Sequence, residues 1–329
     1  MLSACVTLLT LSGLAFAVIQ SVDGSDPPNT SRTFVTWDSL EPDKWASIWL
    51  INTHIDPQAT IEIRPTGDTL TGGIAFGVPA AQYKRSGNQS TFASLLHGFQ
   101  QTDPVLRQVA QMITAIETTA WNTASDPRIA VVEQQFRRLQ DRYRRVYVPV
   151  SCYGHFFDVL YQQLYIQAND AVLSHALAEA VAMPSCEHRS VMAERTPAKR
   201  VLEVTLEQLL TEIDSGKNVV FIDTREPAEF AKAHIPGAIN IPMRDLNDSV
   251  YEQLRQADRV ISYCVKDFRG YEVARQLLDN GVEHSAVMLP HGLSGWQASG
   301  LPLTSATLAE TQAQQQLADC AKDQQCLKQ

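Results

Sequence analysis

The sequence predicts a chain of two domains, of which the second is an α/β fold with a parallel sheet and helices on both faces. Three observations predict this. The chain has 329 residues, more than one typical domain. Its second half alternates β-rich runs with helical runs. Its first half has one early strand signal followed mostly by helical patterns, which indicates a mainly helical α+β domain.

In the second half the expected elements follow one another closely. They are a strand in VVFIDTR, a short helix in PAEFAKAH, an extended AINIPM, a helix in SVYEQLRQ, a strand in RVISYC, a helix in RGYEVARQLLDNG, a strand in SAVML and a turn in GLSGW. In parallel sheets of this kind, functional groups gather at the carboxyl ends of the strands. Cys264 stands at one such end.

The first half contains an expected strand, ATIEIRP, and two long helical patterns. VVEQQFRRLQDRYRRV places apolar side chains at spacings of three and four, which forms one apolar face. Its five arginines lie mostly on the other faces, so we expect a solvated surface, with an anion-binding surface as the alternative. HFFDVLYQQLYIQANDAVLSHALAEAVA is expected to form one core helix. The apolar face of the first pattern comprises Val132, Phe136, Leu139, Tyr143 and Val146.

The chain begins with an apolar stretch in which Ala15-Phe16-Ala17 fits a signal-peptidase site. We therefore expect export, to the periplasm, with no stable membrane insertion after cleavage; an uncleaved membrane anchor is the alternative. The net charge of -9 argues against nucleic acid as a partner. The expected organisation is a signal peptide at 1–17, a first domain at 31–182, a linker at 183–200, an α/β domain at 201–305 and a Gln-rich tail at 306–329.

Cys264 is either a buried structural thiol or a nucleophile on a strand-to-helix turn. A helix N-terminus stabilises a thiolate, and Lys266 and Arg269 add positive charge nearby. The backbone amides from Val265 to Gly270 would form an anion-binding nest if the loop curls around the sulfur. Asp267 opposes this with a negative charge.

Three motifs of the second half resemble the rhodanese-type sulfurtransferases: FIDTREPAEFAKAHIPGAINIP, CVKDFRG and GLSGWQASGLPL. The resemblance implies a cysteine persulfide carrier at Cys264, with Arg269 as the cation that closes the loop and no cofactor. It implies a sulfur donor and a thiol acceptor as partners. The loop residues expected at the substrate are Val265, Lys266, Asp267, Phe268 and Gly270, and those expected to support the site are Asp223 and Arg225.

Loop length distinguishes this chemistry from phosphate chemistry. Four residues separate Cys264 from Arg269, as in the sulfurtransferases, whereas the related dual-specificity phosphatases have a longer, wider loop. Asp267 stands where the family often has Gly, so we expect it to hinder an anionic donor such as thiosulfate. Reduction of chromate or arsenate by Cys264, and a non-catalytic binding or redox-sensing module, are the alternatives.

WASIWLINTHIDPQATIEI and FGVPAAQYKRSGNQSTFASLLHGFQQTDPVLRQVAQMI resemble the C-terminal domain of the chromate-resistance protein ChrB. This resemblance suggests a link to chromate resistance and a protein partner for the first half. His54, Asp56, Glu62 and His97 are polar-site or metal-ligand candidates, but none shows a dedicated ligand spacing, so no metal site is assigned.

Removal of Cys5 with the signal peptide would leave an odd number of cysteines. An oxidising compartment favours pairing of Cys320 with Cys326 in the tail, and of Cys152 with Cys186 if the chain between them folds back. A continuous helix would forbid the second pair, so the tail pair is the stronger expectation. Cys264 would remain unpaired, as a persulfide carrier must.

Overall fold

The computed structural model describes residues 31–86, 89–118, 126–146, 148–183, 186 and 200–327. Arg32–Gln329 cluster as one compact unit. The expected signal peptide, and the expected linker apart from residues 183, 186 and 200, lie outside the described residues. In the described part of the chain, every helix is too short or too polar to span a bilayer.

The first half is built on a small parallel sheet in the order β2-β1-β3. Its strands are β1 (Thr33–Trp37), β2 (Thr60–Arg64) and β3 (Ile74–Ala75). Phe34 pairs with Ile61 on one side and Ile74 on the other, so β1 is the central strand. The expected strand in ATIEIRP is thus confirmed as β2.

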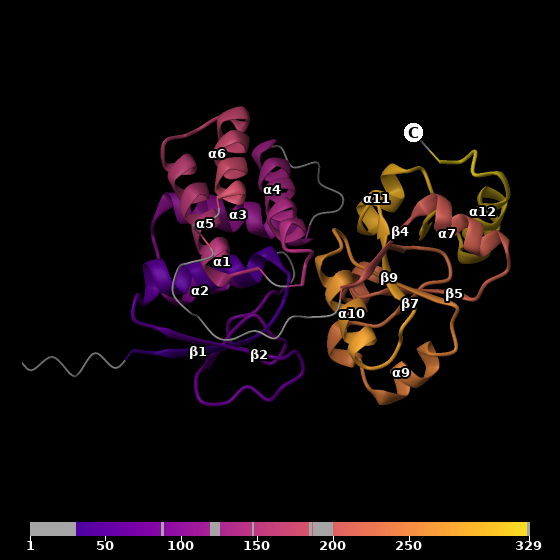
Figure 1. Ribbon diagram of the computed structural model, residues 1–329, viewed down its shortest axis with the longest axis horizontal. Helices are drawn as coiled ribbons and strands as arrows, with labels where there is room; N and C mark the ends of the chain where they lie inside the picture. Colours follow the sequence, from indigo (N-terminus) through magenta and orange to yellow (C-terminus); the bar gives the residue numbers. More distant parts are fainter. Residues whose placement is uncertain are drawn as a thin grey trace, which may run out of the picture. The chain divides into compact units, whose positions relative to one another are not determined.

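Helices gather on one face of this sheet (Figure 1). The predicted amphipathic helix is confirmed as α4, in which Val132, Phe136 and Leu139 are buried. The pattern's last two apolar positions, Tyr143 and Val146, lie beyond the helix end and are half-buried. The helical segments are α1 (Pro42–Leu50), the π-helical η1 (Ile51–Ile55), α2 (Thr91–Gly98), α3 (Pro104–Thr118), α4 (Arg128–Arg142), α5 (Val150–Tyr165) and α6 (Asp170–Ala182).

The expectation of one long core helix is wrong, because the chain breaks between α5 and α6. Gln167 has a φ of 56°, outside the helical region, and Asn169 starts the second helix by accepting a hydrogen bond from the Val172 N–H at 3.0 Å. The break lets the chain fold back on itself. Cys152 and Cys186 come within 4.8 Å between Cα atoms and form a disulfide, which confirms the expected pair.

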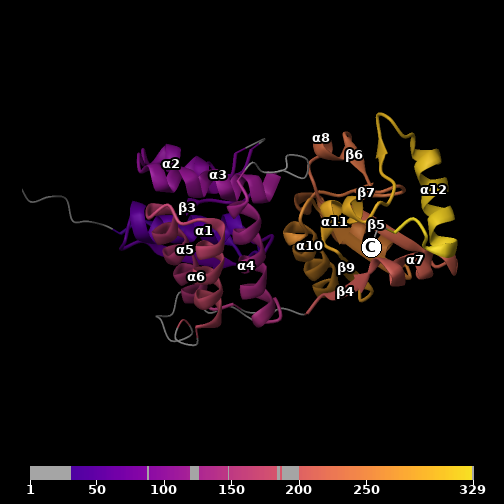
Figure 2. The same ribbon diagram turned by 90° about the horizontal axis from the view of Figure 1, so that it is seen from above.

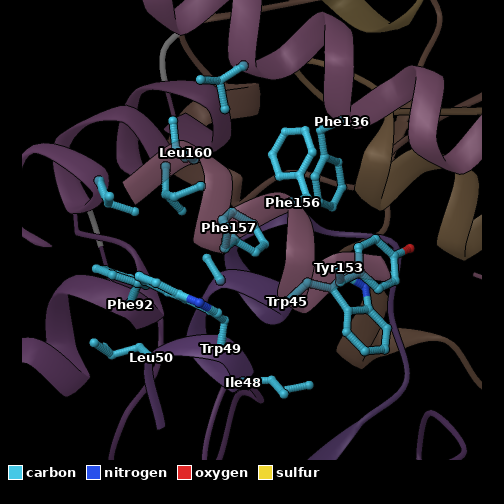
Figure 3. Close-up of a cluster of buried hydrophobic side chains, with 14 of the residues drawn as sticks. Trp45, Ile48, Trp49, Leu50, Phe92, Phe136, Tyr153, Phe156, Phe157 and Leu160 are labelled. Atoms are coloured by element: carbon cyan, nitrogen blue, oxygen red, sulfur yellow. The ribbon is translucent and has the colours of Figure 1, made fainter. Parts of the chain in front are cut away.

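Aromatic side chains from α1, α4 and α5 form the core of the first half (Figure 3). Trp45 stacks on Tyr153 with ring centroids 4.1 Å apart, and Phe136 meets Phe156 edge-on at 5.5 Å. Such pairs add specific ring geometry to the large apolar area that each ring buries. This packing fixes α4 against the rest of the half, which matters because α4 also reaches the second half.

The second half contains a five-stranded parallel sheet in the order β4-β9-β8-β5-β7. Alternate side chains face opposite sides: Phe221 and Ile261 join one core cluster, and Ile222 and Val260 join another. The strands are β4 (Leu202–Thr205), β5 (Val219–Asp223), β7 (Ile239–Asn240), β8 (Arg259–Tyr263) and β9 (Ser285–Leu289); a separate antiparallel pair joins β6 (Ala233–His234) to β10 (Thr304–Ser305).

Helices cover both faces of this sheet, as the sequence predicts. Helices α7, α11 and α12 lie over one face, and α9 and α10 over the other (Figure 1). The segments are α7 (Leu206–Asp214), α8 (Pro227–Phe230), the 3₁₀ turn η3 (Met243–Asp245), α9 (Asp248–Leu254), α10 (Phe268–Asp279), α11 (Gly292–Ala298) and α12 (Glu310–Asp323).

Two expectations for the second half need correction. The GLSGW segment is not a simple turn but the start of α11, with Leu293 and Trp296 fully buried. The Gln-rich tail, expected at 306–329 outside the α/β domain, forms α12, which lies beside α7 (Figure 2), and its Leu317 and Cys320 join the core of that domain. Its apolar residues recur at helical spacing and bury one face, while its glutamines are mostly exposed. The expected disulfide between Cys320 and Cys326 is present.

Candidate functional site

Cys264 follows directly after β8, at the carboxyl end of a central strand of the sheet. Cys264 is 3% exposed, and it is the one free cysteine in the described part of the chain. The Asp267 backbone N–H donates a hydrogen bond to Cys264 Sγ at 3.1 Å. The loop therefore curls back over the sulfur before α10 begins at Phe268.

Helix α11 holds the loop from the opposite direction. The Leu293 N–H donates to the Cys264 carbonyl at 2.8 Å, and the Ser294 N–H donates to the Val265 carbonyl at 3.1 Å. Gly292 permits this approach, because it has a φ of 65° and a Cβ there would lie 2.6 Å from the Val265 oxygen. The GLSGW motif thus fixes the carbonyls of the reactive loop.

Gly270 permits a second close approach, between α10 and β8. A Cβ at this position would lie 2.7 Å from the Tyr263 Cα. The predicted site glycine therefore has a packing role: it lets the first turn of α10 lie directly on the strand that carries Cys264.

Asp223 and Arg225 form a buried ion pair beside this loop. Arg225 Nη2 lies 2.6 Å from an Asp223 carboxylate oxygen and also donates to the Ala233 carbonyl at 2.6 Å. Thr224 binds the neighbouring strand end, since its N–H donates to the Tyr263 carbonyl at 2.9 Å. The pair thus ties β5 to β6, and Thr224, which lies between its two members, ties β5 to the residue just before Cys264.

Arg269 is buried at the start of α10, with its guanidinium 3.8 Å from Glu229. Its Nε has no hydrogen-bond partner. Together with Val265 it lines a cavity of about 690 Å³, whose wall also includes Arg85 and Glu117 from the first half. The cation predicted to close the loop therefore faces a space that the two halves share.

Both halves contribute charged side chains to the wall of this cavity. Arg85 Nη1 lies 2.8 Å from Glu117, and its Nη2 lies 3.2 Å from Glu41. Burial, followed by the nearby charge of Glu41, raises the pKa of Glu117 to about 8. Glu117 is therefore a carboxyl that takes up or loses a proton near neutral pH.

The side chains of the remaining loop residues contact the first half. Lys266 Nζ lies 3.0 Å from Glu133, and Phe268 packs edge-on against Phe136 with centroids 6.1 Å apart. The Asp267 carboxylate lies 3.3 Å from Arg137 and 3.1 Å from Arg145. Burial raises the pKa of Asp267, but Arg145, His291 and Arg137 outweigh it and hold that pKa below its usual value.

These contacts correct two expectations. Asp267 does not present a free negative charge to a donor, since its carboxylate is buried and paired with arginines. The arginines of the VVEQQFRRLQDRYRRV pattern are not all solvated: Arg145 is 3% exposed and stacks over Tyr271 at 4.7 Å from the ring centroid. The anion that Arg137 and Arg145 bind is a side chain of the same protein.

The polar candidates of the first half do not converge. Asp56 forms an ion pair with Arg32 at 3.0 Å, His54 packs against aromatic rings, Glu62 lies on β2 and His97 lies on α2. In the described ranges, no three His, Cys, Asp or Glu side chains are grouped as metal ligands.

The structure places five further residues around the loop and its cavity: Arg85, Glu117, Arg137, Arg145 and His291. Arg137 and Arg145 belong to the pattern for which the sequence left an anion-binding surface open as the alternative. Four of the five residues come from the first half. Nothing in their local sequence distinguishes them from solvated charges, because their partners lie far away along the chain. Only His291 had a local signal, since it directly precedes the GLSGW motif.

Two family models match the chain. Residues 34–164 match the C-terminal domain of ChrB, and residues 205–299 match the rhodanese-like domain. A sulfurtransferase of Allochromatium vinosum is 30% identical over 105 residues, which span 32% of this chain and 96% of that protein. The thiosulfate:glutathione sulfurtransferase of Saccharomyces cerevisiae is 30% identical over 95 residues, spanning 25% of this chain and 68% of that protein.

An uncharacterized protein of Synechocystis sp. is 38% identical over 86 residues, which cover 26% of this chain and 46% of the length of that relative. The match to the rhodanese-like domain, residues 205–299, contains strands β5 to β9, the Cys264 loop and the GLSGW motif. These matches, with relatives named as sulfurtransferases, support a sulfurtransferase. Through its second half, this chain belongs to the rhodanese-like family, and residues 34–164 of its first half match the model of the ChrB C-terminal domain.

Proposed function

We propose that the protein transfers sulfane sulfur through a persulfide on Cys264, with Arg269 as the cation of the loop. One observation carries the proposal: the only free cysteine of the described residues stands at a strand end with a backbone N–H directed at its sulfur. An N–H donor at this distance stabilises a thiolate, and it would equally stabilise the terminal sulfur of a persulfide.

The transfer has two displacement steps. The Cys264 thiolate attacks the outer sulfur of a donor; the donor's sulfur–sulfur bond breaks, and the leaving group departs with the electron pair, as sulfite if the donor is thiosulfate. A thiolate acceptor then attacks the outer sulfur of the Cys264 persulfide. The acceptor persulfide forms, the bond within the Cys264 persulfide breaks, and the Cys264 thiolate is regenerated without an external oxidant or reductant.

The cavity beside Val265 and Arg269 is the proposed route of donor and acceptor. Its wall carries Lys84, Arg85 and Lys232 as well as Glu41 and Glu117. A wall of mixed charge and a volume of about 690 Å³ favour an organic sulfur compound over a small inorganic dianion. The donor is therefore proposed to be an organic persulfide in preference to thiosulfate; attack on its outer sulfur releases the organic thiolate.

Oxyanion reduction, which would link the protein to chromate resistance, is the second candidate, and the ChrB-type domain is the observation that favours it. The pairing of cysteines weighs against it. A thiol that reduces an oxyanion becomes oxidised and needs a second thiol, yet the other cysteines of the described residues form two disulfides. Reduction would therefore consume an external thiol at each turnover.

We further propose that the protein is exported to the periplasm, as its apolar N-terminal stretch led us to expect. Two disulfides support an oxidising compartment. Non-reducing peptide mapping of protein from the native host is the test: both bridges are expected, with Cys264 alone alkylated. Reduced Cys152 and Cys186 in freshly lysed cells would contradict export.

Mass spectrometry tests the sulfurtransferase itself. The purified protein is offered thiosulfate, mercaptopyruvate, an organic persulfide and chromate, and the intact mass is followed. A gain of one sulfur on Cys264, lost on addition of a thiol acceptor, is the expected result. Cys264→Ser should lose both the adduct and the turnover while keeping its fold, and unchanged turnover in that variant would refute the proposal.

A further inference from the structure

The reactive loop is fastened to the first half by consecutive residues. Glu133, Phe136 and Arg137 lie on α4, and they contact Lys266, Asp267 and Phe268 through ion pairs and ring packing. Arg137 also donates to the Lys266 carbonyl and lies over the Phe268 ring at 4.3 Å from its centroid. The part of the loop that covers the sulfur is thus attached to one helix of the other half.

Asp267 is the centre of this attachment and has an unusual backbone. Its φ of 94° lies in the left-handed region, which is unfavourable for a residue with a Cβ and is the conformation that glycine adopts easily. In this conformation its N–H faces Cys264 Sγ at 3.1 Å, and its carbonyl accepts from the Tyr271 N–H at 2.7 Å. The unfavourable backbone conformation of Asp267 must be offset by favourable contacts, and the ion pairs of its carboxylate with Arg137 and Arg145 provide them.

Three cationic or ionisable groups face that carboxylate. Arg145 lies at 3.1 Å, His291 at 3.2 Å and Arg137 at 3.3 Å, while Asp267 is 1% exposed. Arg145 also lies 3.6 Å from Glu203 and 3.3 Å from Asp141, which hold it in place. A buried carboxylate with such partners has one strongly preferred position, and its backbone N–H is fixed with it.

We propose that Arg137 and Arg145 are positioning residues: by holding the Asp267 carboxylate, the first half aims the Asp267 N–H at the sulfur of Cys264. This inference rests on the proposed function of Cys264. In it, the ChrB-type half is a structural part of the sulfur-transfer site, and the aspartate that replaces a small loop residue is its point of attachment.

The reaction of Cys264 with iodoacetamide as a function of pH tests this directly, because it measures the thiolate without needing any sulfur donor. In Arg137→Gln and Arg145→Gln, alkylation below the midpoint of the profile should slow about fivefold to tenfold, because a hydrogen bond to a charged sulfur is weakened. Arg138→Gln is the matched control, since Arg138 is an exposed neighbour on the same helix. An unchanged profile in both test variants would overturn the proposal.

A double-mutant comparison shows whether the arginines act through Asp267. In an Asp267→Gly background, where glycine adopts the same φ without a carboxylate, the further change Arg145→Gln should have little additional effect. A full effect in that background would mean that Arg145 acts on the sulfur by its own charge, and would refute the positioning role. If Arg145→Gln fails to fold, Arg137→Gln, at a half-buried position, can be compared in the wild-type and Asp267→Gly backgrounds instead.

The two proposals fail in different ways. An altered alkylation profile with no persulfide from any donor would leave the positioning role intact and refute sulfur transfer. Persulfide formation with unaltered alkylation profiles in the arginine variants would support sulfur transfer and refute the positioning role of the arginines.

Discussion

Two buried aspartates, Asp223 and Asp267, lie near the reactive loop of the second half. They differ in how far along the chain their arginine partners lie. Asp223 binds Arg225, two residues further along the chain. Asp267 binds Arg137 and Arg145, which precede it by 130 and 122 residues. The first pair needs only a strand end and a tight turn, whereas the second exists only when the two halves pack together. One ion pair of the site therefore lies entirely within the rhodanese-like second half, whereas the other requires arginines of the first half.

The near pair should give the largest stability effect. Arg225→Ala leaves the Asp223 carboxylate buried and without its cation, which typically costs about 3–5 kcal/mol of the free energy of unfolding. Urea unfolding measures this cost. Arg244→Ala is the control, because its pair with Glu226 is exposed and should be worth less than about 1 kcal/mol. Equal losses in the two variants would show that the buried pair has no special role.

The two disulfides also differ in how far apart their cysteines lie in the sequence. Cys152 and Cys186 are 34 residues apart, and Cys320 and Cys326 are 6 residues apart. Because a longer closed loop removes more entropy from the unfolded chain, replacing the first pair by serines should cost about 4 kcal/mol and replacing the second about 2 kcal/mol. Unfolding midpoints of the two double variants test the order. A larger loss from the tail pair would contradict it.

The distant cluster of Arg85, Glu41 and Glu117 should give an effect that is visible only as a pH dependence of the free energy of unfolding. The pKa of Glu117 is raised from 4.5 to about 8, so the folded state binds this proton more tightly than the unfolded state does. Stability from this group is therefore full below about pH 4.5 and falls as the pH rises to about 8.

Glu117→Gln should flatten this fall. Glu41 does not contribute to this fall, because its pKa is shifted downward and it stays ionised in both the folded and the unfolded state between pH 5 and 8. Urea unfolding at several pH values provides the measurement, with Glu179→Gln, on the exposed surface of α6, as the control. A variant whose stability falls as steeply as that of the wild type would refute the assignment to Glu117.

Several parts of the fold could be predicted because they depend on local patterns. The strands in VVFIDTR, RVISYC and SAVML, and the helix in RGYEVARQLLDNG, follow from β-rich runs and helical periodicity. The break between α5 and α6 was missed because the apolar pattern continues through it, although Asn169 is a recognisable helix cap. The packing of the Gln-rich tail could not be predicted, because its apolar residues are separated by glutamines and are buried only against α7.

The sequence by itself determined the alternation of strands and helices in the second half, the place of Cys264 at a strand end and the near pair of Asp223 with Arg225. These depend on neighbours within a few residues, so the residues that form them can be read together. Only the tertiary structure decided what Asp267 does and which arginines are buried. Asp267 forms its ion pairs with Arg137 and Arg145, which lie more than a hundred residues away in the sequence. These contacts depend on how the cores of the two halves pack together, and local residue spacing carries no information about that packing.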